Sequence, residues 1–522
     1  MVPMDKKWWT LIAVSTGTFM LLLDVTIVNV ALPVVQAGLG GSLGDLQWVV
    51  DAYALSLSAL LLTTGSLADL FGRRLLFTIG LVIFSAGSLL CGLAQSPLML
   101  ILSRAGQGIG GAMMFSTSLA LIASNFQGRE RGTAFGVWGA VTGVAVAVGP
   151  ILGGALTSGI SWRAIFLVNV PIGVGAVFVT LTQVDESKQD HAHRPDWVGV
   201  TLFTSGLIGI VYGLIRASET TWGNWGVLVS LAAGLVLLAG FLVAEAVVTD
   251  PMFDLKLFRI PTFVGGSAAA FCMNASLFSV LLYLVLYLQD VRGYSALGTG
   301  LRLLVLSGGT LLTSTIAGRL SSHVPVRYLI GPGLALVGIG LLLMAGLHPT
   351  TDWTHLIPGF IVGGAGAGLV NPPLASTAVG VVEPRDSGMA SGINATFRQI
   401  GIATSIAALG TIFTAAVNHQ LNTLAHRPGM AGRLPAIVAD VKAGNVGAAI
   451  GTTPHRYQGA MLHAAGTGFA NGINDLLIVT AVIAFVGAAA SLALIRPKDF
   501  VGAQAPAPER PTGQAVPAPA ES

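Results

Sequence analysis

Fourteen apolar runs, each about 20 residues long, constrain the fold of this chain more than any other feature of its sequence. A helix that rises 1.5 Å per residue crosses about 30 Å of hydrocarbon in roughly 20 residues. The runs are continuous rather than alternating, and backbone groups in lipid must be hydrogen-bonded within their own segment, so the runs predict helices and not barrel strands. We expect membrane spans at 9–33, 46–68, 75–94, 97–123, 133–157, 164–183, 197–215, 225–248, 262–289, 297–318, 326–347, 355–380, 388–416 and 474–495.

The composition excludes several classes of protein. Of the 522 residues, 53% are apolar and 9% are charged, whereas a soluble domain has about 25% charged residues. Disorder is excluded as well, because a disordered chain needs high charge and low hydrophobicity. The net charge of +3 is too small for a nucleic-acid binder, and two cysteines cannot build a disulfide framework.

The chain lacks the residues that an intramembrane metal site or a nucleotide-binding loop would need. None of the nine histidines lies in the interior of a predicted span, where an intramembrane metal or haem would need its ligands. No lysine follows a glycine, as a phosphate-binding loop requires. We therefore expect a membrane protein with no metal, no cofactor, no nucleotide and no enzymatic activity.

The distribution of lysine and arginine predicts the orientation in the membrane. With the N-terminus inside, sixteen of the 26 basic residues flank the spans on the cytoplasmic side, and four lie in or beside short outer loops. Four more lie in the long loop 417–473, and Arg104 and Arg398 lie within spans. Both termini are therefore expected in the cytoplasm, with 417–473 outside and 496–522 as a disordered cytoplasmic tail.

Two cytoplasmic loops repeat along the chain and divide it into halves. Residues 65–74 align with 318–327, and 129–136 align with 385–392, at offsets of 253 and 256. Such an offset spans eight helices, so both halves face the same way, and a substrate site is expected between them near the midplane. The expected organisation is a six-helix bundle, a linker with two inserted helices, and a second six-helix bundle that includes the loop 417–473, at 1–183, 184–261 and 262–495.

Several short motifs along the spans occur together in one known family. They are Leu23 to Pro33, Gly65 to Arg74, Arg104 to Ala112, Gly149 to Gly154, Trp162 to Pro171, and Tyr287 to Gln289 with Gly293 to Ala296. On these motifs, residues 9–495 closely resemble the major facilitator superfamily and, within it, the fourteen-helix drug:proton antiporters. Three positions depart from the family pattern: Leu70 where a basic residue is usual, Ala145 in place of a glycine, and Ser322 in place of an aspartate.

The resemblance implies an all-α protein of the bacterial plasma membrane with 6+2+6 helices in two pseudo-symmetric bundles. It implies export of amphipathic drugs, antibiotics or natural products in exchange for protons, driven by the proton motive force and carried out by a monomer. Arginine outnumbers lysine 20 to 6, which suggests a GC-rich bacterial genome. The alternatives are a proton:solute symporter for uptake and a membrane sensor that transports nothing.

Three charged residues are candidates for proton coupling. A carboxylate within a span costs a few kcal/mol, so Asp24 is expected to face water or a partner and to mark a proton route. Counting 1.5 Å per residue from the span centres places Asp24, Asp51 and Arg104 in one layer of the outer half. We expect Arg104 to tune the protonation of Asp24, with Asp51 as a second acceptor or as a rim residue that attracts cations. The structural alternatives are an Asp24 that only caps a polar neighbour, a fixed Asp24–Arg104 pair, and an Asp51 in interfacial water.

Two further segments are candidates for gating. Asp69, Gly72, Arg73 and Arg74 form a tight turn, in which Asp69 can dock on a helix N-terminus and favour one conformational state. The alternative explains the arginines as charges that set topology. In the fifth span, the small residues and the proline are expected to pack tightly or bend the helix: Gly149, Pro150, Gly153 and Gly154.

A third set of residues could bind a flat, apolar substrate. Its members are aromatic, methionine or polar residues within spans, although most such side chains pack in the core or face lipid. The candidates are Tyr53, Met113, Phe115, Trp138, Asn274, Tyr283, Tyr287 and Arg398. The sequence does not decide the charge of the substrate, because the acids favour cations and the arginines favour anions.

Overall fold

The computed structural model is helical throughout the residues that it describes, which are 5–126, 128–187, 196–248, 253–321, 324–382, 387–427, 429–442 and 446–500. Thirteen helices in this part of the chain are long and apolar enough to cross a membrane. A further long helix, α2 (Leu43–Phe71), packs along α4 (Pro97–Asn125). Every one of the fourteen predicted spans therefore falls on a helix.

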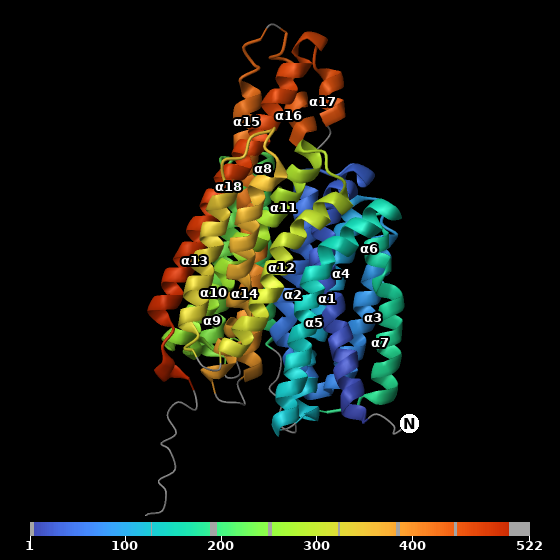
Figure 1. Cartoon of the computed structure of the whole chain (residues 1–522), viewed down its shortest axis with the longest axis vertical. Coiled ribbons are helices and arrows are strands. Elements are labelled where there is room, and N and C mark those ends of the chain that lie inside the picture. Colours follow the sequence, from blue (N-terminus) through green and yellow to red (C-terminus); the bar gives the residue numbers. More distant parts are fainter. Residues whose placement is uncertain are drawn as a thin grey trace, which may run out of the picture.

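The helices form two bundles that lie side by side (Figure 1). The first bundle contains α1 (Lys6–Leu39), α2, α3 (Arg73–Gly92), α4, α5 (Gly128–Gly159), α6 (Ala164–Leu167) and α7 (Asn169–Gln183). The second contains α10 (Pro261–Met273), α11 (Ser279–Leu286), α12 (Ala296–Leu320), α13 (Arg327–Met344), α14 (Ile357–Gly380), α15 (Ser387–Asn422) and α18 (Gln458–Leu494). A π-helical turn, Asn274–Phe278, joins α10 to α11, and a second, Tyr287–Val291, extends α11, so that Pro261–Val291 forms one span.

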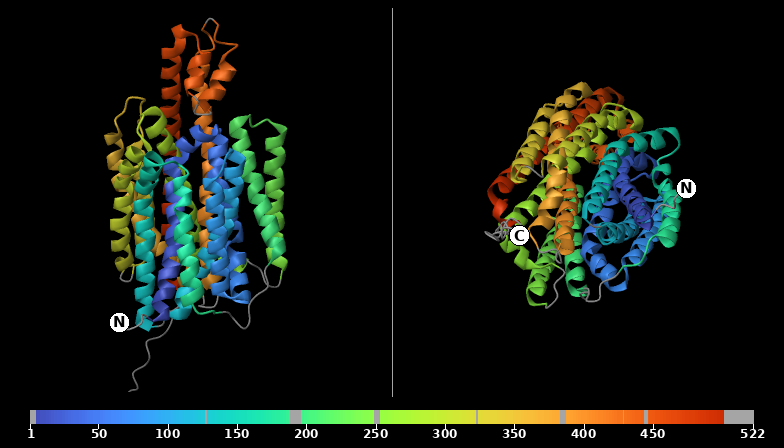
Figure 2. Two further views of the ribbon diagram at one scale, coloured as in Figure 1. Left: turned by 90° about the vertical axis from the view of Figure 1, so that its right-hand side faces the viewer. Right: turned by 60° about the horizontal axis from the view of Figure 1, so that its bottom comes forward.

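The two inserted helices form a hairpin at the edge of the molecule (Figure 2). Helix α8 (Trp197–Glu219) packs against α2 of the first bundle and α15 of the second, so the hairpin touches both. Helix α9 (Trp225–Val247) packs on α8 and is mostly exposed. An apolar helix with so little of its surface buried suits a lipid-facing position.

The helices α15 and α18 continue beyond the bundles and hold two short helices between them, α16 (Leu434–Lys442) and α17 (Val446–Thr452). We call this segment, residues 417–460, the cap. The side of the molecule that carries it is the cap end, and the side where α1 begins and α18 ends is the terminal end (Figure 1). The predicted long loop 417–473 is therefore largely helical, because its apolar residues bury one another in a small core that includes Leu421, Ile437 and Met461.

Local sequence signals explain where the helices at the cap end begin and end. Gly40, with a φ of 66°, ends α1 in the left-handed conformation that glycine adopts at low cost. Ser42 and Asp45 then form a capping box at the start of α2. This tight turn reverses the chain at the cap end, so the charged residues of α1 and α2 lie at similar depths on either side of it.

Candidate functional site

An ion pair lies buried in the first bundle. Arg104 on α4 donates a hydrogen bond from Nη1 to Oδ2 of Asp24 on α1, as the sequence predicted. Asp24 is 0% exposed and Arg104 is 1% exposed. Removing two charges from water costs several kcal/mol per ion, and their attraction offsets this cost only where further hydrogen bonds complete both groups.

Neighbouring helices supply these further hydrogen bonds. Gln107 Nε2 donates to Asp24 Oδ1 at 2.8 Å, and Arg104 Nη1 donates to Gln107 Oε1 at 2.6 Å. Arg104 Nε donates to the Val49 carbonyl of α2 at 3.1 Å. Asn169 at the start of α7 donates from Nδ2 to Asp24 Oδ1 at 3.4 Å. Four helices therefore contribute to one polar network around the side chains of Asp24 and Arg104.

Gln107 and Asn169 lie within the motifs Arg104 to Ala112 and Trp162 to Pro171, but neither was predicted as a site residue. Gln107 is three residues after Arg104, so the two side chains share a face of α4. That spacing is a signal that could have identified Gln107. Asn169 had no comparable signal, because only the packing of α7 against α1 brings it near Asp24.

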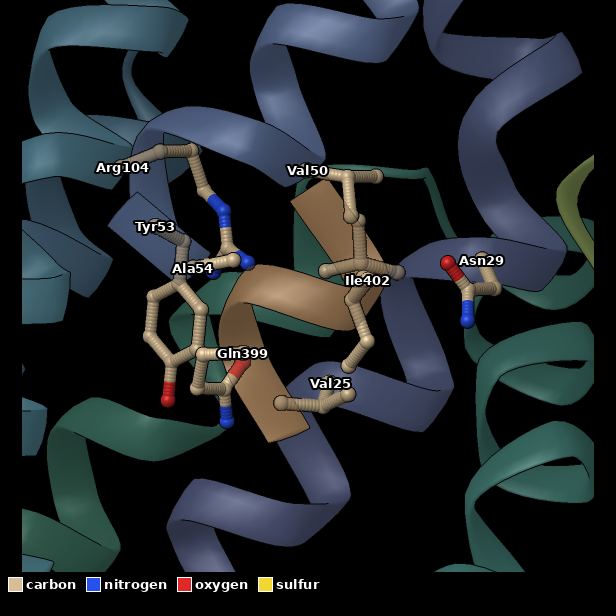
Figure 3. A pocket seen from close by; sticks show the side chains of 9 residues that line it. Val25, Asn29, Val50, Tyr53, Ala54, Arg104, Gln399 and Ile402 are labelled. Carbon is tan, nitrogen blue, oxygen red and sulfur yellow. The ribbon is translucent and has the colours of Figure 1, made fainter. Parts of the chain in front are cut away.

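A small pocket connects the ion pair with the second bundle (Figure 3). Its empty space, part of which is open to the surroundings, amounts to about 290 Å³. Its lining comes from α1, α2, α4 and α15: Val25, Val28, Asn29, Val50, Tyr53, Ala54, Arg104, Gln399 and Ile402. The guanidinium of Arg104 is thus one face of a pocket shared by both bundles.

Tyr53 covers the guanidinium, and its ring centroid lies 4.2 Å from Cζ of Arg104. Its hydroxyl is buried without a hydrogen-bond partner among the described residues. Because a desolvated cation–π contact contributes up to about 2 kcal/mol, we expect Tyr53→Leu to lower the free energy of unfolding by about that amount. Tyr53→Phe keeps the ring and removes only the orphan hydroxyl, so it should be neutral or slightly stabilising. Thermal unfolding of the purified protein in detergent compares the two, and equal destabilisation by both would contradict this role for the ring.

Asp51 lies apart from the ion pair. It is 0% exposed, so the alternative that placed it in interfacial water is wrong. No hydrogen bond joins it to Asp24 or Arg104, and neither of its carboxylate oxygens has a partner among the described residues. Similar depth did not bring the three groups together, because α2 turns Asp51 toward the second bundle.

The small residues of α5 divide into two faces. A Cβ on Gly149 or Gly153 would meet Thr26 or Ile27 of α1, at 1.9 Å and 2.7 Å, so these glycines allow close packing within the first bundle. A Cβ on Gly154 would lie 2.6 Å from the Ala296 carbonyl oxygen on α12.

The same close approach continues on α12. A Cβ on Gly300 would lie 2.1 Å from the Pro150 carbonyl oxygen. Nearby, the Leu297 N–H donates to Ser158 Oγ at 3.1 Å. Gly154, Pro150 and Gly300 therefore hold the two bundles in backbone contact at the cap end.

The predicted turn between α2 and α3 is confirmed as a turn, and Glu186 caps the N-terminus of α3 that follows it. Gly72 has a φ of 120°, and Glu186 accepts from the backbone N–H of Arg74 at 2.9 Å and of Leu75 at 3.1 Å. A carboxylate at a helix N-terminus is favoured by the helix dipole. The backbone N–H of Arg73 donates to the Ser187 carbonyl at 2.9 Å. The side chain of Asp69 and the whole of Ser322 lie outside the described residues.

Several of the predicted substrate residues make hydrogen bonds or packing contacts within one bundle in this structure. Tyr287 donates to the His348 carbonyl at 2.7 Å, and Asn274 donates to the Ala270 carbonyl within its own helix at 2.9 Å. Met113 packs beside Gly80 on α3. Trp138 donates from Nε1 to Thr18 Oγ1 at 2.9 Å, which joins α5 to α1.

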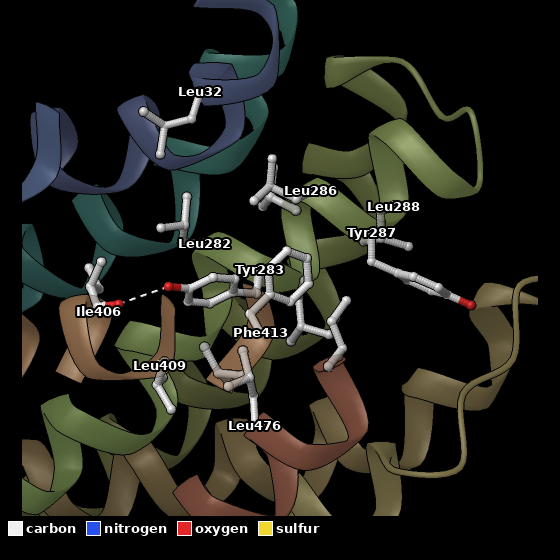
Figure 4. Packing of buried hydrophobic residues seen from close by; sticks show 14 of the residues in the cluster. Leu32, Leu282, Tyr283, Leu286, Tyr287, Leu288, Ile406, Leu409, Phe413 and Leu476 are labelled. Carbon is white, nitrogen blue, oxygen red and sulfur yellow. Dashed lines mark hydrogen bonds between the residues drawn. The ribbon is translucent and has the colours of Figure 1, made fainter. Parts of the chain in front are cut away.

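The remaining candidates lie nearer the interface of the bundles or pack in the first bundle. Tyr283 contacts residues of both bundles (Figure 4). Arg398 is half-buried and donates to Asn394 and Asn371 at 3.4 Å. Phe115 packs half-buried against the core of the first bundle.

A family model described as Major Facilitator Superfamily matches residues 14–406. The chain belongs to the major facilitator superfamily. It is a transporter rather than an enzyme, and a multi-pass protein of the bacterial cytoplasmic membrane. The predicted fold class is confirmed.

Curated relatives cover most of the chain. Multidrug resistance protein Stp of Mycobacterium tuberculosis is 36% identical over 78% of this chain and 76% of its own length. Puromycin resistance protein pur8 of Streptomyces alboniger is 35% identical, covering 93% and 92%. The tetracenomycin C resistance and export protein of Streptomyces glaucescens is 31% identical, covering 93% and 91%.

The solved structures confirm the fold independently. A bacterial homologue of the human lysosomal transporter Spinster, in an inward-facing and unoccupied conformation, superposes with a TM-score of 0.61. It is 17% identical and covers 96% of this chain and 99% of its own. At that identity the similarity concerns the fold alone.

Proposed function

We propose that this transporter exports amphipathic antibiotics or related natural products in exchange for protons. The relatives named above are resistance or export proteins, and two of them are named for puromycin and tetracenomycin C. The proposed substrate class follows from these names. The proposed energy source is the proton motive force, with no cofactor.

The buried Asp24–Arg104 pair is the observation that carries the proposal. Asp24 accepts from Arg104, Gln107 and Asn169 while it is ionised. A proton on Asp24 would weaken its contact with Arg104, whose guanidinium would keep the Gln107 and Val49 oxygens as acceptors. Since Arg104 also faces the pocket between the bundles, a substrate there would compete with the proton for the same network.

The alternation between states would proceed by rocking of the two bundles about their interface. We propose that the cap end faces outward and the terminal end faces the cytoplasm, on the distribution of basic residues along the chain. One proton entering down 100 mV supplies about 2.3 kcal/mol, and one pH unit adds about 1.4 kcal/mol. Their sum supports a substrate gradient of several hundredfold at a 1:1 ratio.

The test uses the purified chain in liposomes with puromycin as the probe. An acidic lumen should drive accumulation of puromycin, because protons leave as substrate enters, and a protonophore should abolish it. Accumulation only with an acidic exterior would replace antiport by symport. Failure to accumulate either puromycin or tetracenomycin C under either gradient would overturn proton-driven export of this substrate class.

A further inference from the structure

Three acceptor oxygens lack partners at one place on α2. Both carboxylate oxygens of Asp51 and the amide oxygen Oε1 of Gln47 are buried and have no hydrogen-bond partner among the described residues. Both side chains are 0% exposed. Gln47 precedes Asp51 by four residues, so the two occupy one face of the helix. None of the three oxygens carries a hydrogen while Asp51 is ionised, so they cannot hydrogen-bond to one another. One added proton on Asp51 would allow such a bond.

This face of α2 lies against the second bundle. Gln47 Nε2 donates to Tyr283 Oη and to the Ile406 carbonyl, each at 3.0 Å, and Tyr283 donates to the same carbonyl at 2.8 Å (Figure 4). Farther along α2, the Ser58 carbonyl accepts from Thr396 Oγ1 at 3.4 Å. Asp51 lies between these two contacts on the same face, so closure of the bundles at the cap end encloses it.

No cation compensates Asp51 among the described residues. From α4 and α1, Arg104 and Asp24 face each other within their own network. On α15, Arg398 contacts Asn394 and Asn371. On α8, Arg216 is exposed. An ionised carboxylate enclosed without a partner costs several kcal/mol, whereas a neutral carboxylic acid can donate.

We propose that Asp51 binds a proton from the medium at the cap end and that the bundles close there only when it is neutral. The acid O–H donates to Gln47 Oε1, which supplies the missing hydrogen and polarises the amide that contacts Tyr283 and Ile406. The proton is taken up and returned on the same side, because Asp51 is enclosed while the cap end is closed. Asp51 is therefore a sensor of pH at the cap end, distinct from the transported proton at Asp24.

This inference rests on the proposed alternation of the cap end, but its test is independent of coupling at Asp24. Two cysteines are introduced at exposed cap-end positions, one in each bundle, by the substitutions Ile160→Cys and Thr350→Cys. Spin labels attached to them report the separation of the bundles by pulsed electron resonance. The native Cys91 and Cys272 are replaced by serine. These separations are measured on the full chain in nanodiscs and in the Asp24→Asn background, where the transported proton is absent.

One titrating proton changes the ratio of closed to open forms by up to about tenfold per pH unit. Because the closed form holds the proton, the ratio should fall as pH rises. Asp51→Asn should keep the closed form and flatten this slope, since its amide can donate to Gln47 at any pH. Asp352→Asn, at an exposed carboxylate of the cap end, should leave the slope unchanged. A slope in Asp51→Asn equal to that of its parent would overturn the proposal.

Two measurements with Asp24 intact complete the test. The infrared spectrum of the closed form should contain a protonated carboxyl band that Asp51→Asn removes, and absence of that band would contradict the neutral acid. The number of protons moved per substrate in liposomes should be the same in Asp51→Asn and its parent. A loss of one proton per substrate would make Asp51 a carrier and not a sensor. If Asp24→Asn loses coupling while the Asp51 results are as expected, only the proposed role of Asp24 is affected. The same holds if Asp24→Asn keeps its coupling.

Discussion

Asp24→Asn is expected to abolish uphill export, reducing a substrate gradient of several hundredfold to simple equilibration. The amide retains the size of the side chain and cannot exchange a proton. Arg104 then has no carboxylate to release, so substrate binding no longer depends on protonation. Substrate-driven proton release by the purified protein measures this directly and should fall to the level of empty liposomes.

The control must separate coupling from folding. Asp185→Asn removes a carboxylate that pairs with Lys6 at the surface, where both side chains are more than 60% exposed, and should leave export intact. Arg104→Gln alone leaves Asp24 buried without its cation, which is expected to destabilise the protein by about 3–5 kcal/mol. Combining Arg104→Gln with Asp24→Asn removes both charges and should restore much of this stability.

The double variant also distinguishes a purely structural role of the ion pair from a role in proton coupling. If the pair only holds the bundle together, a folded double variant should recover proton-coupled export. We expect it to recover folding but not proton release. Recovery of both, or normal proton release in Asp24→Asn alone, would exclude Asp24 from proton coupling.

The sequence predicted the depth of charged residues better than their neighbours. Depth follows from counting residues along a span, and this was enough to predict that Asp24 and Arg104 meet. Rotation of a helix about its own axis depends on packing against other helices, and it separates Asp51 from the same pair. Gln107 and Asn169 were missed because uncharged polar residues are common in the spans and only the packed bundle selects these two.

The positions of the membrane spans were predicted correctly, because hydrophobicity alone determines them. All fourteen spans fall on helices, because a run long enough to cross the bilayer must satisfy its own backbone. The cap was predicted as a loop, since the residues between the last two spans are too polar to read as a span. Its short helices are marginal alone and depend on the contacts among α15, α16, α17 and α18.

Gly154→Val is expected to stop export nearly completely while leaving the first bundle folded. A Cβ at this position would lie 2.6 Å from both the Ala296 carbonyl oxygen and the Leu297 Cα. These are backbone atoms of the other bundle, so the clash is relieved by keeping the bundles apart at the cap end. The variant should therefore be held open there, with a thermal stability close to that of its parent.

Two further glycine-to-valine substitutions on α5 test whether the effect depends on this contact with the other bundle. No heavy atom lies within 4 Å of a Cβ on Gly159, so Gly159→Val should export normally. A Cβ on Gly153 would lie 2.7 Å from the Ile27 carbonyl oxygen within the same bundle, so Gly153→Val should lose stability instead.

Cross-linking measures the closure itself. Cysteines are introduced by Ser158→Cys and Leu297→Cys. In the parent, Ser158 Oγ lies 3.1 Å from the backbone nitrogen of Leu297 across the interface. The two cysteines should cross-link in the parent and in Gly159→Val, and fail to do so in Gly154→Val. Normal export together with retained cross-linking in Gly154→Val would show that the bundles do not need this backbone contact to close. Loss of export with retained cross-linking would place the defect elsewhere in the cycle, because closure at the cap end would then be intact.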